Sequence, residues 1–206
     1  MLNELLKRYP CLESTREDII KAENALITCF KNGNKLLMCG NGGSCADCEH
    51  IAGELMNGFL SKRPLSEEQM AEMKANCPEM EEKYLSLLQR AVPAIDLPSF
   101  TALNTAFCND VEPELVFAQG LMGLGKKDDI LLCISTSGNS KNVVAAALTA
   151  KALGLKTIGL TGKTGGKLKS ICDICVCVPE TETFKVRKLH LPVYHYLCAR
   201  VEEDVF

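Results

Sequence analysis

The chain contains no tryptophan and only three histidines among its 206 residues, and 5% of its residues are aromatic. It also has no excess of positive charge, because 23 lysines and arginines face 26 aspartates and glutamates, for a formal charge of −3. Binding to the phosphate backbone of nucleic acids requires clustered cations, so direct nucleic-acid binding is not expected. The longest stretch without Asp, Glu, Lys or Arg, residues 97–109, is too short to cross a bilayer.

Charged residues also interrupt the start of the chain, where Glu4, Lys7 and Arg8 leave no room for the apolar core of a signal peptide. We therefore expect a soluble cytoplasmic protein without membrane contact. In that compartment the twelve cysteines are expected to be reduced thiols and not a disulfide framework. The pairs Cys45/Cys48 and Cys172/Cys175 lie far apart in the sequence without a matching histidine pattern, which disfavours a zinc ribbon.

Short apolar runs alternate with longer amphipathic segments, which is typical of parallel βα units. Five runs are candidate strands: 35–40, 129–136, 156–162, 173–179 and, more weakly because prolines bracket it, 92–97. The candidate helices are 14–32, 44–57, 139–153 and 184–203. This order predicts an α/β fold, a three-layer αβα sandwich whose central parallel sheet is doubly wound as in flavodoxin-like proteins.

Residues 66–90 differ in composition from the rest of the chain. They carry many charges and methionines and no glycine, and Pro78 divides them into two short helical patterns. Ser66, followed by acidic residues, is a suitable helix start. A segment this short cannot bury a core of its own. We expect a helical insertion within a single domain spanning 1–206, of which 1–34 form an N-terminal helical segment.

The first candidate binding loop is CGNGGS, residues 39–44, between an expected strand and an expected helix. Open α/β sheets bind ligands at such junctions. The glycines allow a ligand to approach the backbone closely, and Asn41 and Ser44 add polar side chains at a helix N-terminus. A dinucleotide-binding fingerprint would need glycine where Cys45 stands and an acidic residue at the end of a following strand. No nucleotide cofactor is therefore expected.

The second candidate loop is STSGNS, residues 135–140, which leads directly into another expected helix. Four hydroxyl groups and the flexible Gly138 form a cradle for an anion without a positive charge. No Gly-Lys-Ser/Thr follows this loop, which excludes a Walker A motif. A capped turn would need only one hydroxyl, so we favour a site for the phosphate of a phosphorylated sugar.

His50 and Glu54 are four residues apart and project from one face of the helix expected after the glycine-rich loop. Such a pair is either a hydrogen-bonded surface pair or half of a metal or acid/base site. Taken alone, the surface pair would be the better interpretation. The position next to the glycine-rich loop favours the functional one.

Two strings carry a family resemblance: LLMCGNGGSCADCEHIAGEL, residues 36–55, and ISTSGNSKNVV, residues 134–144. Together they resemble the SIS (sugar isomerase) superfamily and, more narrowly, the sedoheptulose-7-phosphate isomerases, or phosphoheptose isomerases. That family includes a catalytically silent relative that associates with the replication initiator. The resemblance extends to LTGKTGGKL, residues 160–168, and to the C-terminal helix, and covers nearly all of the chain except 66–90.

The resemblance implies an isomerase that interconverts a ketose phosphate and an aldose phosphate, such as sedoheptulose 7-phosphate and D-glycero-D-manno-heptose 7-phosphate. Glu54 and His195 would be catalytic, and a zinc ion could be held by His50, Glu54 and His195. The expected substrate-binding residues are Asn41, Gly42, Gly43, Ser44, Asn109, Asp110, Ser135, Thr136, Ser137 and Ser140. Relatives form homo-oligomers with active sites between subunits, so a tetramer or dimer is expected. The mechanism requires the 135–140 loop to lie within roughly one sugar length of Glu54, within one chain or across chains.

Arg187 departs from the family pattern, which has a glutamine zinc ligand at this position. Arginine cannot bind zinc, so Arg187 would instead polarise the substrate carbonyl or bind an additional anionic group of the substrate. Pro192, shortly before His195, can redirect that imidazole. These departures motivate an alternative function, a non-catalytic regulator that binds sugar phosphates or a protein-interaction factor of the same fold. A phosphosugar lyase or an amino-sugar deacylase would need acid/base residues that we cannot identify in the sequence.

Overall fold

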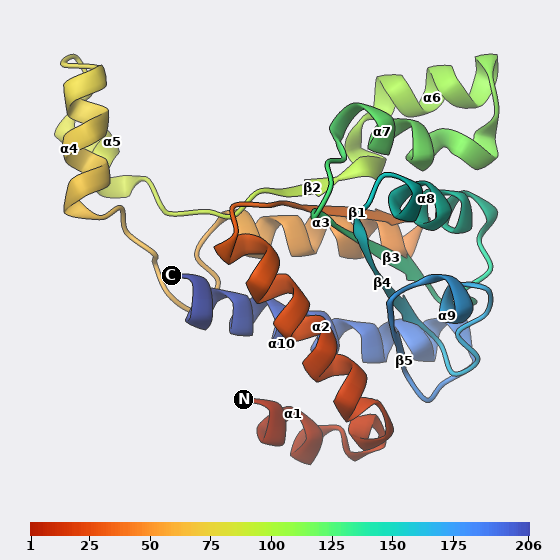
Figure 1. Cartoon of the computed structure of the whole chain (residues 1–206). Coiled ribbons are helices and arrows are strands. Elements are labelled where there is room, and N and C mark those ends of the chain that lie inside the picture. Colours follow the sequence, from red (N-terminus) through yellow and green to blue (C-terminus); the bar gives the residue numbers. More distant parts are fainter.

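A computed structural model describes all 206 residues, built around one five-stranded sheet. The strands are β1 (Leu36–Gly40), β2 (Ala94–Asp96), β3 (Ile130–Ser135), β4 (Lys156–Thr161) and β5 (Ile174–Cys177). Their order is β2-β1-β3-β4-β5, and every neighbouring pair is parallel (Figure 1). All five predicted strands are present, each a little shorter than its apolar run, and the predicted α/β fold is confirmed.

Helices cover both faces of the sheet (Figure 1). One face carries α1 (Leu2–Arg8), α2 (Arg16–Lys31), α3 (Gly43–Met56) and α10 (Thr183–Val205). The other face carries α7 (Val116–Leu124), α8 (Lys141–Ala152) and α9 (Leu168–Ile171), with α6 (Thr101–Asp110) packed outside on α7. Three-residue 3₁₀ turns at Leu97–Ser99 and Pro113–Leu115 flank α6, and a longer one, Pro10–Thr15, precedes α2. The sequence patterns did not predict α6 and α7, and they placed the start of α2 two residues early.

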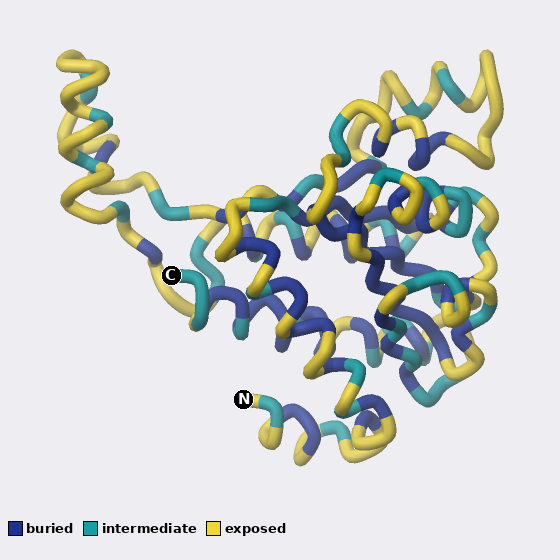
Figure 2. Tube along the Cα trace, in the orientation of Figure 1, coloured by how far each residue is buried: buried dark blue, intermediate teal, exposed yellow.

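Side chains of each strand alternate between two hydrophobic cores. Leu36 and Met38 of β1 face a core of 31 buried residues under α2, α3 and α10. Leu37 and Cys39 face a core of 14 buried residues under α7, α8 and α9. Strands that are covered on both faces consist of continuous apolar runs. This is why the strands could be predicted from the sequence. Figure 2 shows the burial concentrated in the sheet and the inner helix faces.

Helix α10 continues through Pro192 without interruption, over Thr183–Val205. Pro192 therefore does not start a new helix before His195. Proline removes one backbone donor and disfavours a helix interior. Here the helix buries Val186, Val193 and Tyr194 against the sheet and α3, which outweighs that loss.

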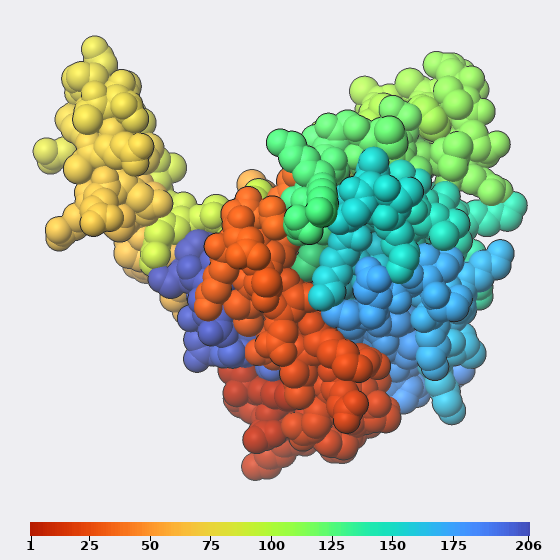
Figure 3. All heavy atoms as spheres, viewed as in Figure 1, coloured from red at the N-terminus to blue at the C-terminus, as the bar shows by residue number.

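Residues 66–88 form a helical arm within the segment 66–90, which was expected to be a helical insertion. Its helices are α4 (Glu67–Asn76) and α5 (Glu82–Leu87), with Pro78 between them. A capping box starts α4, in which Ser66 and Gln69 exchange hydrogen bonds at 3.1 and 3.0 Å. No residue of α4 is buried, and Leu85 is the only buried residue of α5. The arm stands away from the body of the protein (Figures 1 and 3).

None of the helices has the length and apolar character required to cross a membrane. None of the twelve cysteines is paired in a disulfide.

Candidate active site

The glycine-rich loop connects β1 to α3 at the carboxyl edge of the sheet. Asn41 and Asn142 exchange side-chain hydrogen bonds at 2.8 and 2.9 Å, which tie this loop to the first turn of α8. Ser44 is buried in the first turn of α3. Sequence reasoning missed Asn142, and its only signal was its position two residues after the second loop.

The second loop connects β3 to α8 at the same edge. Ser135 and Ser140 share a hydrogen bond of 3.0 Å between their hydroxyls, and the Ser137 hydroxyl accepts from the Asn139 N–H at 3.1 Å. Gly138 has a φ of +65°, and a Cβ there would overlap the backbone of Gly165, so glycine is required. The N-cap residue of α8, Ser140, makes no side-chain cap hydrogen bond, and in the first turn the Val143 N–H donates to Asn142 Oδ1 at 3.0 Å. Helix N-termini of this kind favour anions.

The glycine-rich loop borders a cavity of about 330 Å³, to which the 135–140 loop contributes no lining residue. It is lined by residues of the glycine-rich loop, of α6 and of α8, among them Gly40, Asn41, Gly42, Asn104, Cys108 and Asn142. Asn109 and Asp110 do not line it. They are exposed at the end of α6, where Asn109 donates to the Asp110 carboxylate at 2.8 Å. The helix thus places Asn104 and Cys108, and not the two predicted residues, at the cavity.

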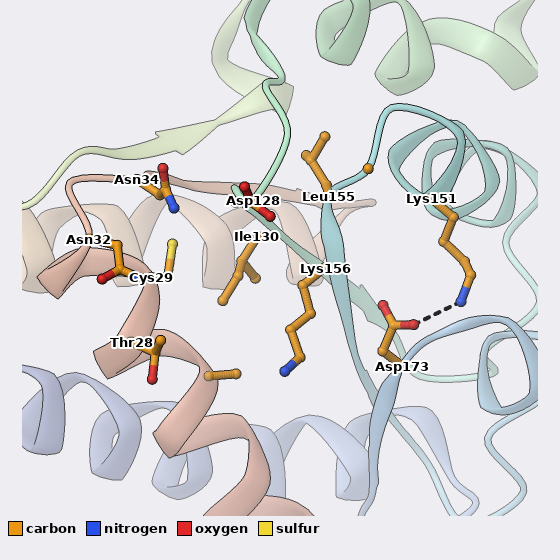
Figure 4. Close-up of a pocket in the computed structure, with 12 residues that line it drawn as sticks. Thr28, Cys29, Asn32, Asn34, Asp128, Ile130, Lys151, Leu155, Lys156 and Asp173 are labelled. Carbon is orange, nitrogen blue, oxygen red and sulfur yellow. Dashed lines mark hydrogen bonds and ion pairs between the residues drawn. The ribbon is translucent and has the colours of Figure 1, made fainter.

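A second cavity, of about 430 Å³, lies at the opposite edge of the sheet (Figure 4). It is lined by residues at the amino ends of β1, β3 and β4, including Asn34, Asp128 and Lys156. Lys151 and Asp173 form an ion pair of 2.8 Å at its side. Sheets of this type bind ligands at the carboxyl ends of their strands, so this cavity is not the candidate site.

His50, Glu54 and His195 form a cluster between α3 and α10. The Nε2 atom of His50 lies 2.9 Å from Oε1 of Glu54, and the two imidazole centroids are 5.0 Å apart. The potential ligand atoms of all three side chains lie within 4.8 Å of one another. The structure therefore brings together the three residues predicted to bind a metal.

The chemistry of this cluster fits a divalent metal ion. Two imidazoles and one carboxylate are a donor set that catalytic zinc sites use, with a coordination position left for substrate or water. The Nε2 atom of His195 is buried and has no hydrogen-bond partner. Burial lowers the pKa of His195, and the nearby His50 adds to this effect. His195 is therefore held in the neutral form, which is the form that binds metals.

Arg187 lies at the other end of α3 from the cluster. Its Nη2 atom donates to the Gly43 carbonyl at 3.0 Å and to Asp47 Oδ1 at 3.3 Å. Two turns of α10 separate Arg187 from His195, which corresponds to about 12 Å. Within one chain, Arg187 therefore borders the glycine-rich loop and does not reach the ligand cluster.

Distance also separates the cluster from the two loops within one chain. Three turns of α3 lie between Gly43 and Glu54, which is about 16 Å along the helix axis. The 135–140 loop adjoins the Gly43 end, through the Asn41–Asn142 pair. A single chain therefore does not place the 135–140 loop within a sugar length of the Glu54 carboxylate.

Comparisons with known proteins all find SIS-domain proteins or phosphoheptose isomerases among the relatives of this chain. Two family models, both described as SIS domain, match residues 2–95 and 102–200. A phosphoheptose isomerase of Nitratiruptor is 38% identical over 98% of this chain and 96% of its own length. One from Helicobacter pylori is 38% identical over 97% and 89%, respectively.

Solved structures agree with the sequence relatives. A phosphoheptose isomerase from Francisella tularensis superposes with a TM-score of 0.78 at 30% identity, covering 95% of this chain and 91% of that one. One from Neisseria gonorrhoeae gives 0.77 at 28% identity, covering 98% and 94%.

Proposed function

The chain belongs to the phosphoheptose isomerase family of SIS-domain proteins, and we propose on this basis that it is an aldose–ketose isomerase of sugar phosphates. The substrate we assign is sedoheptulose 7-phosphate, converted to D-glycero-D-manno-heptose 7-phosphate. The observation that carries this proposal is the convergence of His50, Glu54 and His195 from two helices, in a chain that also holds an anion-binding loop.

The reaction transfers two protons through an enediol. Glu54 removes a proton from C1 of the ketose and returns it to C2, while the proton of the C1 hydroxyl passes to the C2 oxygen. His195 lies beside Glu54 and takes one of two roles. It carries out the second transfer, since a neutral imidazole can accept and donate a proton, or it holds a metal that polarises the two oxygens. The phosphate binds at 135–140, so that binding energy far from the reacting carbons orients them.

A divalent metal, for which zinc is our assignment, would be held by His50, Glu54 and His195. When bound, it would polarise the carbonyl oxygen of the substrate as a Lewis acid. Arg187 cannot supply the glutamine ligand of the family. Its place beside Gly43 instead supports a role for its guanidinium at the sugar-binding end of α3.

A second copy of the chain completes the active site in this proposal. The axial distance of about 16 Å between Gly43 and Glu54 is longer than a sugar phosphate can bridge without a partner's loop. Leu60 and Leu191 are exposed apolar side chains, and both line the same groove as His195. An apolar groove of about 450 Å³ beside His195, between α1 and α10, offers further surface to bury. These features support a homo-oligomer, a dimer or tetramer, with active sites between subunits.

We further propose that residues 1–206 form one domain in the cytoplasm. The two matched regions, 2–95 and 102–200, contribute strands to the same sheet, in which β1 lies between β2 and β3. Twelve free thiols are consistent with a reducing compartment. The 66–88 arm is then an insertion in that domain.

The function is tested with the purified full-length protein and sedoheptulose 7-phosphate, following formation of the aldose product. Glu54→Gln should abolish turnover while leaving sugar-phosphate binding largely intact, because the amide is not a base. Glu49→Gln is the matched control, since Glu49 is exposed on the same helix and contacts Cys45 instead of the cluster. Binding without turnover in the unmodified protein would instead support the non-catalytic regulator. Full activity of Glu54→Gln would remove Glu54 from the role of base.

A further inference from the structure

A line of hydrogen bonds runs along the interface of α3 and α10. It connects the glycine-rich loop with the cluster of His50, Glu54 and His195. Arg187 and Tyr194, both on α10, donate to the same atom, Asp47 Oδ1, at 3.3 and 3.5 Å. The Tyr194 hydroxyl also lies 3.1 Å from Nδ1 of His50. The other ring nitrogen of His50, Nε2, faces Glu54 at 2.9 Å.

The polarity of this line follows from the groups in it. Asp47 and Glu54 both only accept hydrogen bonds. Without a metal, the imidazole proton lies on Nε2 and is donated to Glu54 at 2.9 Å, and Nδ1 accepts from the Tyr194 hydroxyl at 3.1 Å. With a metal on Nε2, the proton of the neutral imidazole must lie on Nδ1. The Tyr194 oxygen then accepts from Nδ1, and the Tyr194 hydroxyl donates to Asp47.

Burial keeps the line intact. Tyr194 is 2% exposed and Asp47 is 6% exposed, so water does not compete for these groups. The guanidinium of Arg187 supplies the positive charge that a buried carboxylate requires.

We propose that Asp47 and Tyr194 are positioning residues that hold His50 with its proton on Nδ1 and its Nε2 lone pair available to a divalent metal. This inference rests on the metal centre in the proposed function. The proposal also gives Arg187 a role. Arg187 stands where the family has its glutamine ligand, and here its guanidinium holds the Asp47 carboxylate in place. Groups that orient a metal-binding histidine typically change metal affinity by about 10- to 100-fold when they are removed.

The chain contains a matched control for this proposal. Tyr196 lies two residues after Tyr194 on α10 and is also buried, at 7% exposure. Its hydroxyl bonds to Glu23 of α2, away from the cluster. Tyr194→Phe and Tyr196→Phe therefore each remove one buried hydroxyl from the same helix, but only the first interrupts the line to His50.

The experiment titrates zinc into metal-free full-length protein in competition with a chromogenic chelator. We expect Tyr194→Phe to weaken zinc binding by about 10- to 100-fold, and Tyr196→Phe to retain the affinity of the unmodified protein. Thermal unfolding of both variants checks that each is folded. Nitrogen-15 NMR of the zinc-loaded protein supplies a second readout, because with only three histidines the Nδ1–H form of His50 can be observed directly.

Each outcome of the zinc titration supports or overturns the positioning role of Asp47 and Tyr194. Equal zinc affinity in Tyr194→Phe and the unmodified protein, or equal losses in both tyrosine variants, overturns the positioning role. Absence of zinc binding to the unmodified protein also overturns it, while the isomerase assay decides the proposed function independently. Conversely, selective loss of zinc affinity in Tyr194→Phe supports the positioning role even if sedoheptulose 7-phosphate is not a substrate.

Discussion

Arg187 lies directly over Gly43, and its guanidinium occupies the space that a Cβ at residue 43 would fill. The same guanidinium donates to the Gly43 carbonyl at 3.0 Å and to Asp47 at 3.3 Å. A glycine at the start of α3 is thus required by a side chain that comes from the C-terminal helix.

Gly43→Ala should displace Arg187 and cost about 1–2 kcal/mol in the free energy of unfolding, because hydrogen bonds from a charged group are lost. In an Arg187→Ala background the same substitution should cost nothing or be slightly stabilising, since alanine favours a helix over glycine. Urea denaturation of the four proteins measures this coupling. An equal cost of Gly43→Ala in both backgrounds would contradict the direct contact.

Glu202→Gln should destabilise the protein by about 3–5 kcal/mol, because it leaves the charge of Arg63 buried without a counter-ion. The two side chains are 0% and 5% exposed and lie 2.6 Å apart. Glu202 also accepts from the N–H groups of Phe59, Leu60 and Ser61. The neighbouring Glu203→Gln is the control and should change stability by less than about 0.5 kcal/mol, since Glu203 is exposed. Chemical denaturation of both variants provides the measurement, and similar values for the two would refute the prediction.

Asp96 should make the protein less stable as the pH rises toward neutrality. Burial, followed by the charge of Glu49, raises the pKa of this carboxyl from 3.8 to about 6, and neither oxygen has a hydrogen-bond partner. The folded state thus binds this proton more tightly than the unfolded state. The resulting stability is complete below pH 3.8 and is lost as the pH passes through about 6.

Asp96→Asn should remove this dependence, because the amide stays neutral. Above pH 6 we expect the variant to be more stable than the unmodified protein by about 1–2 kcal/mol. Denaturation curves recorded from acidic to neutral pH test this. Parallel pH profiles for the two proteins would show that Asp96 does not titrate in this range.

Excision of the 66–88 arm should leave the rest of the fold intact. Pro64 and Gln89 pair across its base, and the Arg90 N–H donates to the Arg63 carbonyl at 2.8 Å, so a short glycine linker can join the ends. Leu85 is the only buried residue in the two arm helices. We expect the thermal midpoint to change by no more than a few degrees. A large decrease in the midpoint would mean that the arm stabilises the body of the protein.

Local patterns in the sequence were sufficient to predict much of this structure. The five strands, the two loops at their carboxyl ends, the arm and the His50–Glu54 pair all follow from short-range rules of periodicity, turn composition and helical spacing. Helices α6 and α7 were missed. Residues 97–109, which include α6, combine threonine, asparagine and phenylalanine, which favour helix only weakly. Packing therefore decides the structure of the two helices: α6 packs on α7, and α7 packs on α8.

What the sequence determined by itself was thus the order of the elements and the chemistry carried on each. Only the tertiary structure brought His195 to His50, paired Asn41 with Asn142, and turned Arg187 toward Asp47. Such contacts join residues far apart in the chain, and their geometry depends on how helices pack across the sheet. No local pattern encodes that packing, because it is set by the burial of whole faces and not by neighbouring residues.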